Sequence, residues 1–233
     1  MIRISSSFKK ILLLVILLAV PGLLYYLLQE KGKNRYHPLD IFGPKQVSST
    51  FHTKRGKKIA DTIYHTVNNF KLTNQANEIF NYPADSSTIT VVNFFFSRCP
   101  SFCASMNSEM ARVAKQYSNN KLLQFISITV NPEYDTPEVL KKYAEKYNIP
   151  LSKWQFLTGS QDSIYKLARQ SFMVDAINDT TKLNIIHSPM LILLDPQKRI
   201  RGYYDSTNKE QVDKLANEIK VLIAEELRKI KFP

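Results

Sequence analysis

The stretch VVNFFFSRCPSFC, from Val91 to Cys103, contains both of the chain's cysteines. Its first half, Val91–Phe96, is β-branched and aromatic, which predicts a buried strand. Cys99 and Cys103 follow where this strand is expected to give way to a helix. Two cysteines four positions apart on a helix share a face, with Cα atoms about 6 Å apart, a distance that a disulfide can span.

A position at the start of a helix gives the two thiols a particular chemistry. A helix N-terminus has unsatisfied N–H groups and a partial positive charge, which favour the thiolate, the form that binds metals and attacks disulfides. Two such thiolates are able to form a disulfide or to converge on one small, soft cation. The simpler interpretation, two small core residues, fits poorly because both cysteines lie at the junction and the chain has no others.

An apolar segment near the N-terminus predicts attachment to a membrane. Ile11 to Leu28 is an uncharged, mostly apolar run of about 18 residues, just long enough to span a bilayer. Bulky residues follow it in place of a small-x-small cleavage site, so we expect a retained signal anchor over residues 1–30. The break at Pro21-Gly22 leaves a cleaved signal as the alternative.

The residues around this segment indicate its orientation. Basic residues flank it on both sides, while the free amino terminus and Glu30 favour a cytoplasmic N-terminus. The thiols would then lie in a periplasm-like compartment, where disulfides persist. No Arg- and Ser-rich transit peptide precedes the segment. The expected location is therefore a bacterial inner membrane, crossed once, with the domain facing the periplasm.

Length and charge limit the remaining organisation. The chain has 233 residues and a formal net charge of +12, and roughly 200 residues after the anchor suffice for one domain with a core. Residues 31–58 are polar, basic and interrupted by proline and glycine, which indicates a linker before a domain over 59–233. The sequence has no basic run interleaved with aromatic residues, the pattern typical of nucleic-acid binding, so no nucleic-acid partner is expected. The charge predicts a solvated, membrane-facing surface and is compatible with an acidic or anionic-lipid partner.

Strand and helix patterns alternate along the domain. Residues 59–66 and 70–72 are expected to form an opening hairpin, and Asp135 with Glu138 predicts a capping box. Further strands are expected at 89–96, 122–130, 154–157, 190–194 and 200–204, and helices at 106–117, 137–147, 162–170 and 209–229. This order predicts an α/β domain with a central mixed sheet and helices on both faces.

Three motifs carry a resemblance to a known family. They are the aromatic strand with its two cysteines, Phe94–Cys103, the Asn-Pro-x-x-Asp-Thr segment within Thr129–Pro137, and the His-Ser-Pro strand with a following Asp-Pro turn, Ile186–Pro196. Over about residues 60 to 228 the chain resembles the SCO/SenC family of membrane-anchored copper-binding proteins needed for cytochrome oxidase assembly. The resemblance implies a thioredoxin-like fold.

The resemblance also implies a metal site. Its ligands would be Cys99, Cys103 and His187, which together would hold one copper per chain as Cu(I), Cu(II) or both. Two thiolates and one imidazole suit Cu(I), which prefers soft sulfur and low coordination. Asp135 matches the family's carboxylate near the metal, a group that could orient His187 or a partner. An N-cap of the following helix explains Asp135 equally well.

Three functions follow from these features. The first is a membrane-anchored metallochaperone that receives copper from a donor protein and delivers it to a subunit of cytochrome c oxidase or another cuproenzyme. The second is an extracytoplasmic thiol-disulfide oxidoreductase, in which Cys99 attacks a partner's disulfide and Cys103 resolves the product. A peroxiredoxin-like peroxidase is less consistent with the sequence, because neither thiol has the Pro-x-x-x-Thr/Ser-x-x-Cys context.

Overall fold

The computed structural model describes residues 6–31, 38–54, 56–85, 87–174, 177–178, 185–186 and 188–231, in two units, Met1–His37 and Pro38–Pro233. The first unit contains the helix α1 (Ser6–Lys31). Leucine, isoleucine and valine side chains between Leu13 and Leu24 are exposed along this helix. Within the described ranges, no helix combines the length and the apolar character needed to cross a membrane.

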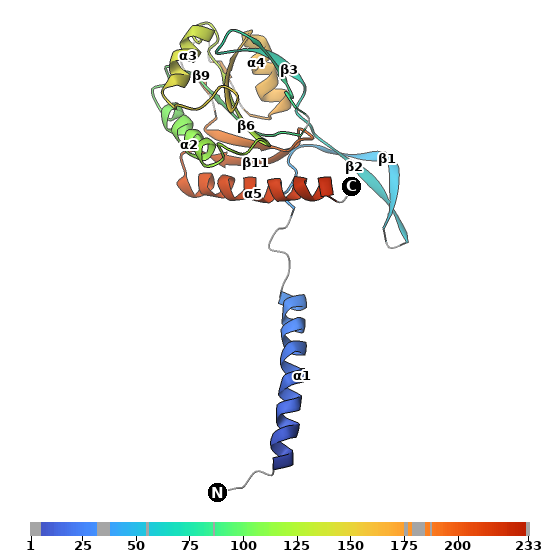
Figure 1. The fold of residues 1–233 in the computed structure, drawn as a ribbon. Helices are drawn as coiled ribbons and strands as arrows, with labels where there is room; N and C mark the ends of the chain where they lie inside the picture. Colours follow the sequence, from blue (N-terminus) through green and yellow to red (C-terminus); the bar gives the residue numbers. More distant parts are fainter. Residues whose placement is uncertain are drawn as a thin grey trace. The chain divides into compact units, whose positions relative to one another are not determined.

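The second unit is built on a mixed sheet of seven strands, in the order β11-β10-β5-β6-β7-β3-β4 (Figure 1). The three central strands run parallel, and two strands add antiparallel at each side. The strands are β3 (Phe70–Asn74), β4 (Ile79–Tyr82), β5 (Ile89–Phe95), β6 (Leu123–Thr129), β7 (Trp154–Thr158), β10 (Met190–Leu194) and β11 (Ile200–Asp205). The predicted α/β architecture with a central mixed sheet is confirmed.

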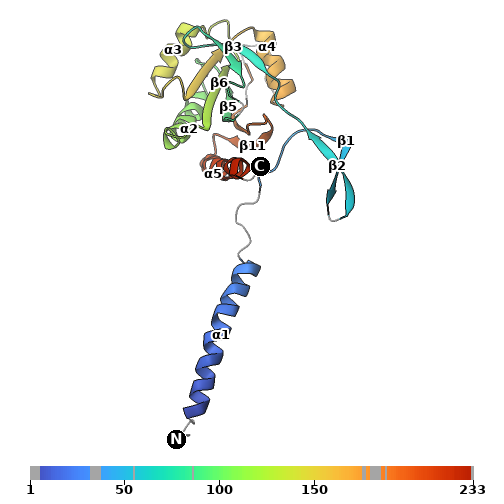
Figure 2. The ribbon, with the colours of Figure 1, turned by 45° about the vertical axis from the view of Figure 1, so that its right-hand side comes forward.

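Helices cover both faces of this sheet because its central strands are apolar on both sides. All seven residues of β5 are buried: Val91 and Phe95 belong to one core cluster, and Val92 and Phe94 belong to the other. Figure 2 shows α2 and α3 on one side of the strands and α4 on the other. The helices are α2 (Cys103–Gln116), α3 (Pro137–Glu145), α4 (Gln161–Lys166), which continues into the π-helical turn η1 (Leu167–Ser171), and α5 (Lys209–Lys231).

A separate antiparallel hairpin, β1 (Lys45–Lys54) with β2 (Lys57–Tyr64), projects from this unit (Figure 1). The predicted pairing of residues 59–66 with 70–72 is wrong, because β2 pairs with β1 while β3 pairs with β4. β1 falls inside residues 31–58, where a linker is expected. Its described side chains are mostly exposed, so the strand has no buried face and its sequence lacks the alternation that marks one. A further short pair joins β8 (Ile177–Asn178) to β9 (Ile185–Ile186).

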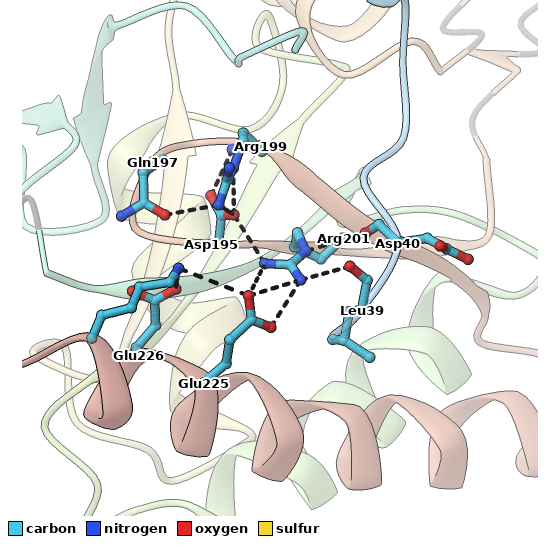
Figure 3. Close-up of polar contacts among 9 residues, drawn as sticks. Leu39, Asp40, Asp195, Gln197, Arg199, Arg201, Glu225 and Glu226 are labelled. Atoms are coloured by element: carbon cyan, nitrogen blue, oxygen red, sulfur yellow. Dashed lines mark hydrogen bonds and ion pairs between the residues drawn. The ribbon is translucent and has the colours of Figure 1, made fainter. Parts of the chain in front are cut away.

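A buried ion-pair network joins the start of the second unit to its C-terminal half (Figure 3). Arg201 of β11 is 2% exposed and donates to the carbonyl oxygens of Leu39 (2.7 Å) and Asp40 (3.1 Å). The same guanidinium pairs with Asp195 (3.2 Å) in the turn after β10 and with Glu225 (2.9 Å) on α5. One side chain therefore fixes three chain segments.

Candidate functional site

Cys99 and Cys103 lie at the carboxyl end of β5, a central strand of the sheet. Cys99 is partly buried in the loop after β5, and Cys103 is the first residue of α2 and is 1% exposed. The predicted strand-to-helix junction is confirmed, but the two cysteines do not share a helix as predicted. Cys99 precedes Pro100, and a residue before proline is disfavoured in the helical region, so α2 begins only at Cys103.

The Cys99 and Cys103 thiols differ in acidity. Burial acts to raise the pKa of Cys99, but hydrogen bonds from Cys103 and Ser101 outweigh it and lower this pKa below its ordinary value. The Ser101 hydroxyl lies 3.4 Å from the Cys99 sulfur. Burial raises the pKa of Cys103, and its hydrogen bond to Cys99 raises it further. The pair therefore holds one proton on the buried Cys103 and favours a thiolate at the more accessible Cys99.

Asp135 fixes the loop that carries Cys99. Its fully buried carboxylate accepts hydrogen bonds from the Ser97 backbone N–H (3.0 Å), the Ser97 hydroxyl and the Thr129 hydroxyl. The N-cap of α3 is Thr136, whose side chain accepts from the Val139 N–H, so the predicted capping role of Asp135 is wrong by one residue. Asp135 faces inward to the cysteine loop because Thr136 already caps the helix.

A chain of buried polar side chains lies beneath the cysteines, and the sequence analysis missed it. Asn93 of β5 donates to the side-chain oxygen of Asn107 (2.7 Å), and Asn107 donates to the Tyr143 hydroxyl (3.0 Å). On the other side of Asn93, Ser127 donates to its oxygen (2.6 Å), and the Trp154 indole N–H donates to Ser127 (2.9 Å). The available signal was Asn93 itself, a polar residue within the apolar strand Ile89–Phe95. Because its members satisfy one another, the chain fixes β5 against α2 and α3.

A cavity of about 660 Å³ opens beside the two cysteines. Its walls come from the loop after β5, from α2 and from the end of α3, and they combine apolar surface with basic side chains. The lining residues are Phe96, Ser97, Cys99, Cys103, Ala104, Ser108, Ala111, Arg112, Lys115, Tyr143, Lys146 and Tyr147. Cys99, the more accessible of the two, thus borders a space large enough for a bound ligand or peptide side chains.

The predicted third ligand, His187, lies outside the described residues, which resume at Ser188. Two other histidines have partners elsewhere: His52 contacts the Asp61 carboxylate (2.6 Å) and His65 contacts the Ser171 carbonyl oxygen (2.7 Å). Across the described ranges, no three His, Cys, Asp or Glu side chains converge in a group able to hold a metal ion. The structure therefore brings together Cys99 and Cys103, with Asp135 behind their loop.

Comparison with known proteins identifies relatives of the whole domain. The sequence matches the SCO1/SenC family over residues 60–224. It is 30% identical to an SCO2-like protein of Rickettsia typhi over 221 residues, which cover 92% of this chain and all of that protein.

Solved structures similar to the chain include members of the same family. A SCO1/SenC family lipoprotein from Bacillus anthracis has 28% identity and a TM-score of 0.61, covering 68% of this chain and 95% of that one. BsSco, described as a member of the Sco family of cytochrome c oxidase assembly proteins with a disulfide switch, has 26% identity and a TM-score of 0.59, covering 67% and 92%.

A third structure, yeast Sco1 with copper bound, shares the fold, with 24% identity and a TM-score of 0.54 over 67% of this chain and 89% of that one. The chain is also 30% identical over 117 residues to a protein of Stutzerimonas stutzeri described as a putative copper-binding protein, which covers 48% of this chain and 56% of that one. The family match spans most of the domain and includes the cysteine junction, and on this evidence the chain is a member of the SCO1/SenC family.

Proposed function

We propose that the chain is a copper metallochaperone that binds one copper ion through Cys99, Cys103 and His187 and delivers it to cytochrome c oxidase. The observation that carries the proposal is the pair of thiols, which hydrogen-bond to each other and line a cavity; the pKa of Cys99 is lowered and that of Cys103 is raised. Such a pair supplies one thiolate to capture a soft cation and a second sulfur to complete its coordination.

The donor set fits copper in either oxidation state. Thiolate sulfur is the soft ligand that Cu(I) prefers, and imidazole suits both Cu(I) and Cu(II). With both thiols deprotonated and the imidazole neutral, the site would have a net charge of −1 around Cu(I) and zero around Cu(II). Copper binding would release the Cys103 proton, because only the thiolate is a good ligand.

The strand register supports the inclusion of His187. β10 runs antiparallel to β5, with Ile192 opposite Val92 and Leu194 opposite Thr90. β10 therefore begins at the end of the sheet where β5 ends and the cysteine loop starts. Residues just before Met190 approach that end of the sheet by chain connectivity. The register therefore supports His187, three positions before Met190, as the third ligand.

Asp135 is proposed to position the metal-binding loop rather than to bind copper. Its carboxylate is engaged by Ser97 and Thr129, and Ser97 lies two residues before Cys99. Groups that orient the residues next to ligands tune a metal site without touching the metal. The buried carboxylate would hold the loop in the same conformation with and without copper.

Attachment to the bacterial inner membrane, with the thiols on the periplasmic side, is the second part of the proposal. It rests on the uncharged run Ile11–Leu28, on the exposed apolar side chains of α1 and on the basic residues that flank them. A solved relative is a lipoprotein, so attachment to a membrane has a precedent among relatives. An anchor would confine the search for a recipient to the membrane plane.

The proposed recipient is a copper-containing subunit of cytochrome c oxidase, and the proposed source is a separate copper donor protein. The support is the relative BsSco, placed among cytochrome c oxidase assembly proteins, and the copper-bound yeast relative. Transfer would proceed by ligand exchange, with Cys99 as the more accessible sulfur that first meets the partner.

A thiol-disulfide oxidoreductase is the second candidate, and the acidity difference favours it specifically. A lowered pKa at the accessible Cys99 and a raised pKa at the buried Cys103 describe an attacking thiol and a resolving thiol. The disulfide switch attributed to BsSco is consistent with this chemistry. The two functions differ in their need for His187.

A copper titration separates the two candidates. The reduced full chain in detergent, its His187→Ala variant and a His52→Ala control would be titrated anaerobically with Cu(I) against a chromophoric chelator. His52 is the control because it lies on the β1–β2 hairpin and contacts Asp61. The proposal expects one tightly bound copper in the parent and the control, and a large loss of affinity in His187→Ala. Equal affinities in all three would favour the oxidoreductase.

A further inference from the structure

The cavity beside the thiols has walls contributed by two helices and a basic rim. Ala104, Ser108 and Ala111 of α2 leave room on one side, and the rings of Tyr143 and Tyr147 form the other. Both Cys99 and Cys103 contribute to the lining. A group that enters the cavity is therefore held against the reacting sulfurs.

The charge of this cavity is positive. Arg112, Lys115 and Lys146 line it, and none of the described lining residues is acidic. Arg112 is paired with Glu109 (2.8 Å) and Asp213 (2.8 Å), which leaves little of its charge unopposed. Neither lysine forms an ion pair with any described residue.

Lys146 and the nearby Arg98 add to the positive potential beside the cysteines. The Lys146 ammonium lies 4.9 Å from the centre of the Tyr143 ring, so an aromatic face supports it without neutralising it. Arg98, directly before Cys99, is exposed and stacks 3.5 Å from the centre of the Tyr134 ring. Cys99, which is partly buried, is thus approached through a region of positive potential.

We propose that this cavity receives an acidic segment of the protein that exchanges copper or a disulfide with the thiols. The inference rests on the proposed function for the identity of the partner, and it adds the chemistry by which the partner is recognised. Carboxylates flanking the partner's cysteine would pair with Lys115 and Lys146 while its sulfur meets Cys99. Complementary charge of this kind raises the rate of association and rejects basic partners.

The exchange reaction itself provides a test with synthetic peptides. The Cys99 thiolate attacks one sulfur of a peptide disulfide, which forms a Cys99–peptide disulfide and releases the first peptide as a thiolate. Cys103 then gives up its proton to solvent and attacks the Cys99 sulfur, which releases the second peptide. In total, the protein dithiol is oxidised to a disulfide and the peptide disulfide is reduced to two thiols.

The experiment compares three disulfide-linked peptides of equal length, with aspartate, serine or lysine flanking the single cysteine. The reduced full chain would react with each at low and high salt, and the products would be separated after acid quenching. The variant is Lys115→Gln/Lys146→Gln, and the matched control is Lys166→Gln/Lys209→Gln, two exposed lysines outside the cavity lining. Rates are compared between proteins for the same peptide, which cancels the intrinsic reactivity of each peptide.

We expect the cavity variant to react roughly tenfold more slowly with the acidic peptide at low salt, with no change for the serine peptide and no effect of the control. An equal rate for the acidic peptide would overturn the inference. Glutathione disulfide tests whether the cavity recognises a protein segment or any anionic disulfide. If the cavity variant slowed the reaction with this small molecule as much as the reaction with the acidic peptide, the assignment to a protein segment would be overturned. Copper affinity is measured in parallel, so weak copper binding with retained charge selectivity would count against the proposed function alone.

Discussion

Ser97 donates both its backbone N–H and its hydroxyl to the buried carboxylate of Asp135, 38 positions later in the chain. The contact joins the cysteine loop to the residue that precedes the N-cap of α3, and Thr129 at the end of β6 completes it. A carboxylate from a neighbouring segment therefore sets the conformation of the loop, and the loop conformation in turn positions the thiols.

Replacing Asp135 by asparagine should loosen this loop. The amide has one oxygen and an NH₂ group that cannot accept, so at least one buried donor loses its partner. We expect a loss of about 2 kcal/mol in the free energy of unfolding and a fall in Cu(I) affinity of about tenfold. Urea unfolding and chelator competition measure the two effects. Glu133→Gln, an exposed change in the same loop, should alter neither, and an unchanged copper affinity in Asp135→Asn would remove the positioning role.

The acidity of Cys99 should depend on Cys103. The hydrogen bond from Cys103 is the largest influence that lowers the pKa of Cys99, so Cys103→Ala should move the pH midpoint of Cys99 alkylation upward. Cys103→Ser retains a donor and should shift the midpoint less. Iodoacetamide kinetics followed by mass spectrometry would determine both midpoints. A midpoint identical in the parent and the alanine variant would show that Cys103 does not stabilise the thiolate.

Lys153 should make stability rise with pH in mildly alkaline solution. Burial lowers the pKa of Lys153 to about 8, while the unfolded chain keeps a pKa near the ordinary value, about 10.4. Between these values the unfolded state binds more protons, so the folded state gains stability as pH rises. From pH 8 to pH 10 the gain is about 2 kcal/mol.

Lys153→Met isolates this contribution, since the tyrosines that also titrate at alkaline pH are common to both proteins. Urea unfolding at each pH should show that the parent's free energy of unfolding rises relative to that of the variant from pH 8 to pH 10. The variant loses the two hydrogen bonds that Lys153 donates to the carbonyl oxygens of Asn120 and Leu123. This loss lowers its stability at every pH without changing how stability varies with pH. Parallel curves would show that Lys153 keeps an ordinary pKa in the folded state.

Substitution of Arg201 should lower the stability of the fold more than most substitutions outside the cysteine site. Arg201→Met removes the donors to Leu39 and Asp40 and leaves the buried Asp195 with Arg199 as its remaining cation. Breaking such a network costs about 3 kcal/mol or more. Arg201→Lys keeps the charge but cannot bridge the same acceptors, so it should recover only part of the loss. Thermal and urea unfolding would test this order, and full stability in Arg201→Met would contradict it.

Much of the domain could be predicted from local patterns. The apolar run of β5, the β10–β11 pair and the amphipathic α5 have strong periodicity and few alternatives, and their predicted ranges match closely. β1 was not predicted because its side chains are mostly exposed and its sequence shows no alternation of apolar and polar residues. Its stability comes from backbone pairing with β2. The pairing partner of β2 depends on contacts across the hairpin, which periodicity does not encode.

The placement of the two cysteines could be predicted from the sequence, whereas the residues that support them could not. Two cysteines at a strand-to-helix junction stand out in any reading of the chain. The buried chain from Asn93 to Tyr143 and the attachment of Asp135 to Ser97 depend on which segments the fold brings together. The capping assignment failed by one residue because Asp135 and Thr136 are both good caps by type, and only tertiary contacts decide between them.

X-ray absorption fine structure at the copper edge tests the central claim most directly. The reduced full chain would be loaded with one equivalent of Cu(I) and compared with His187→Ala and the His52→Ala control. We expect two sulfur neighbours and one nitrogen neighbour in the parent and in His52→Ala, with the nitrogen contribution lost in His187→Ala and both sulfurs retained. A first shell unchanged by His187→Ala, or one with fewer than two sulfurs in the parent, would contradict it.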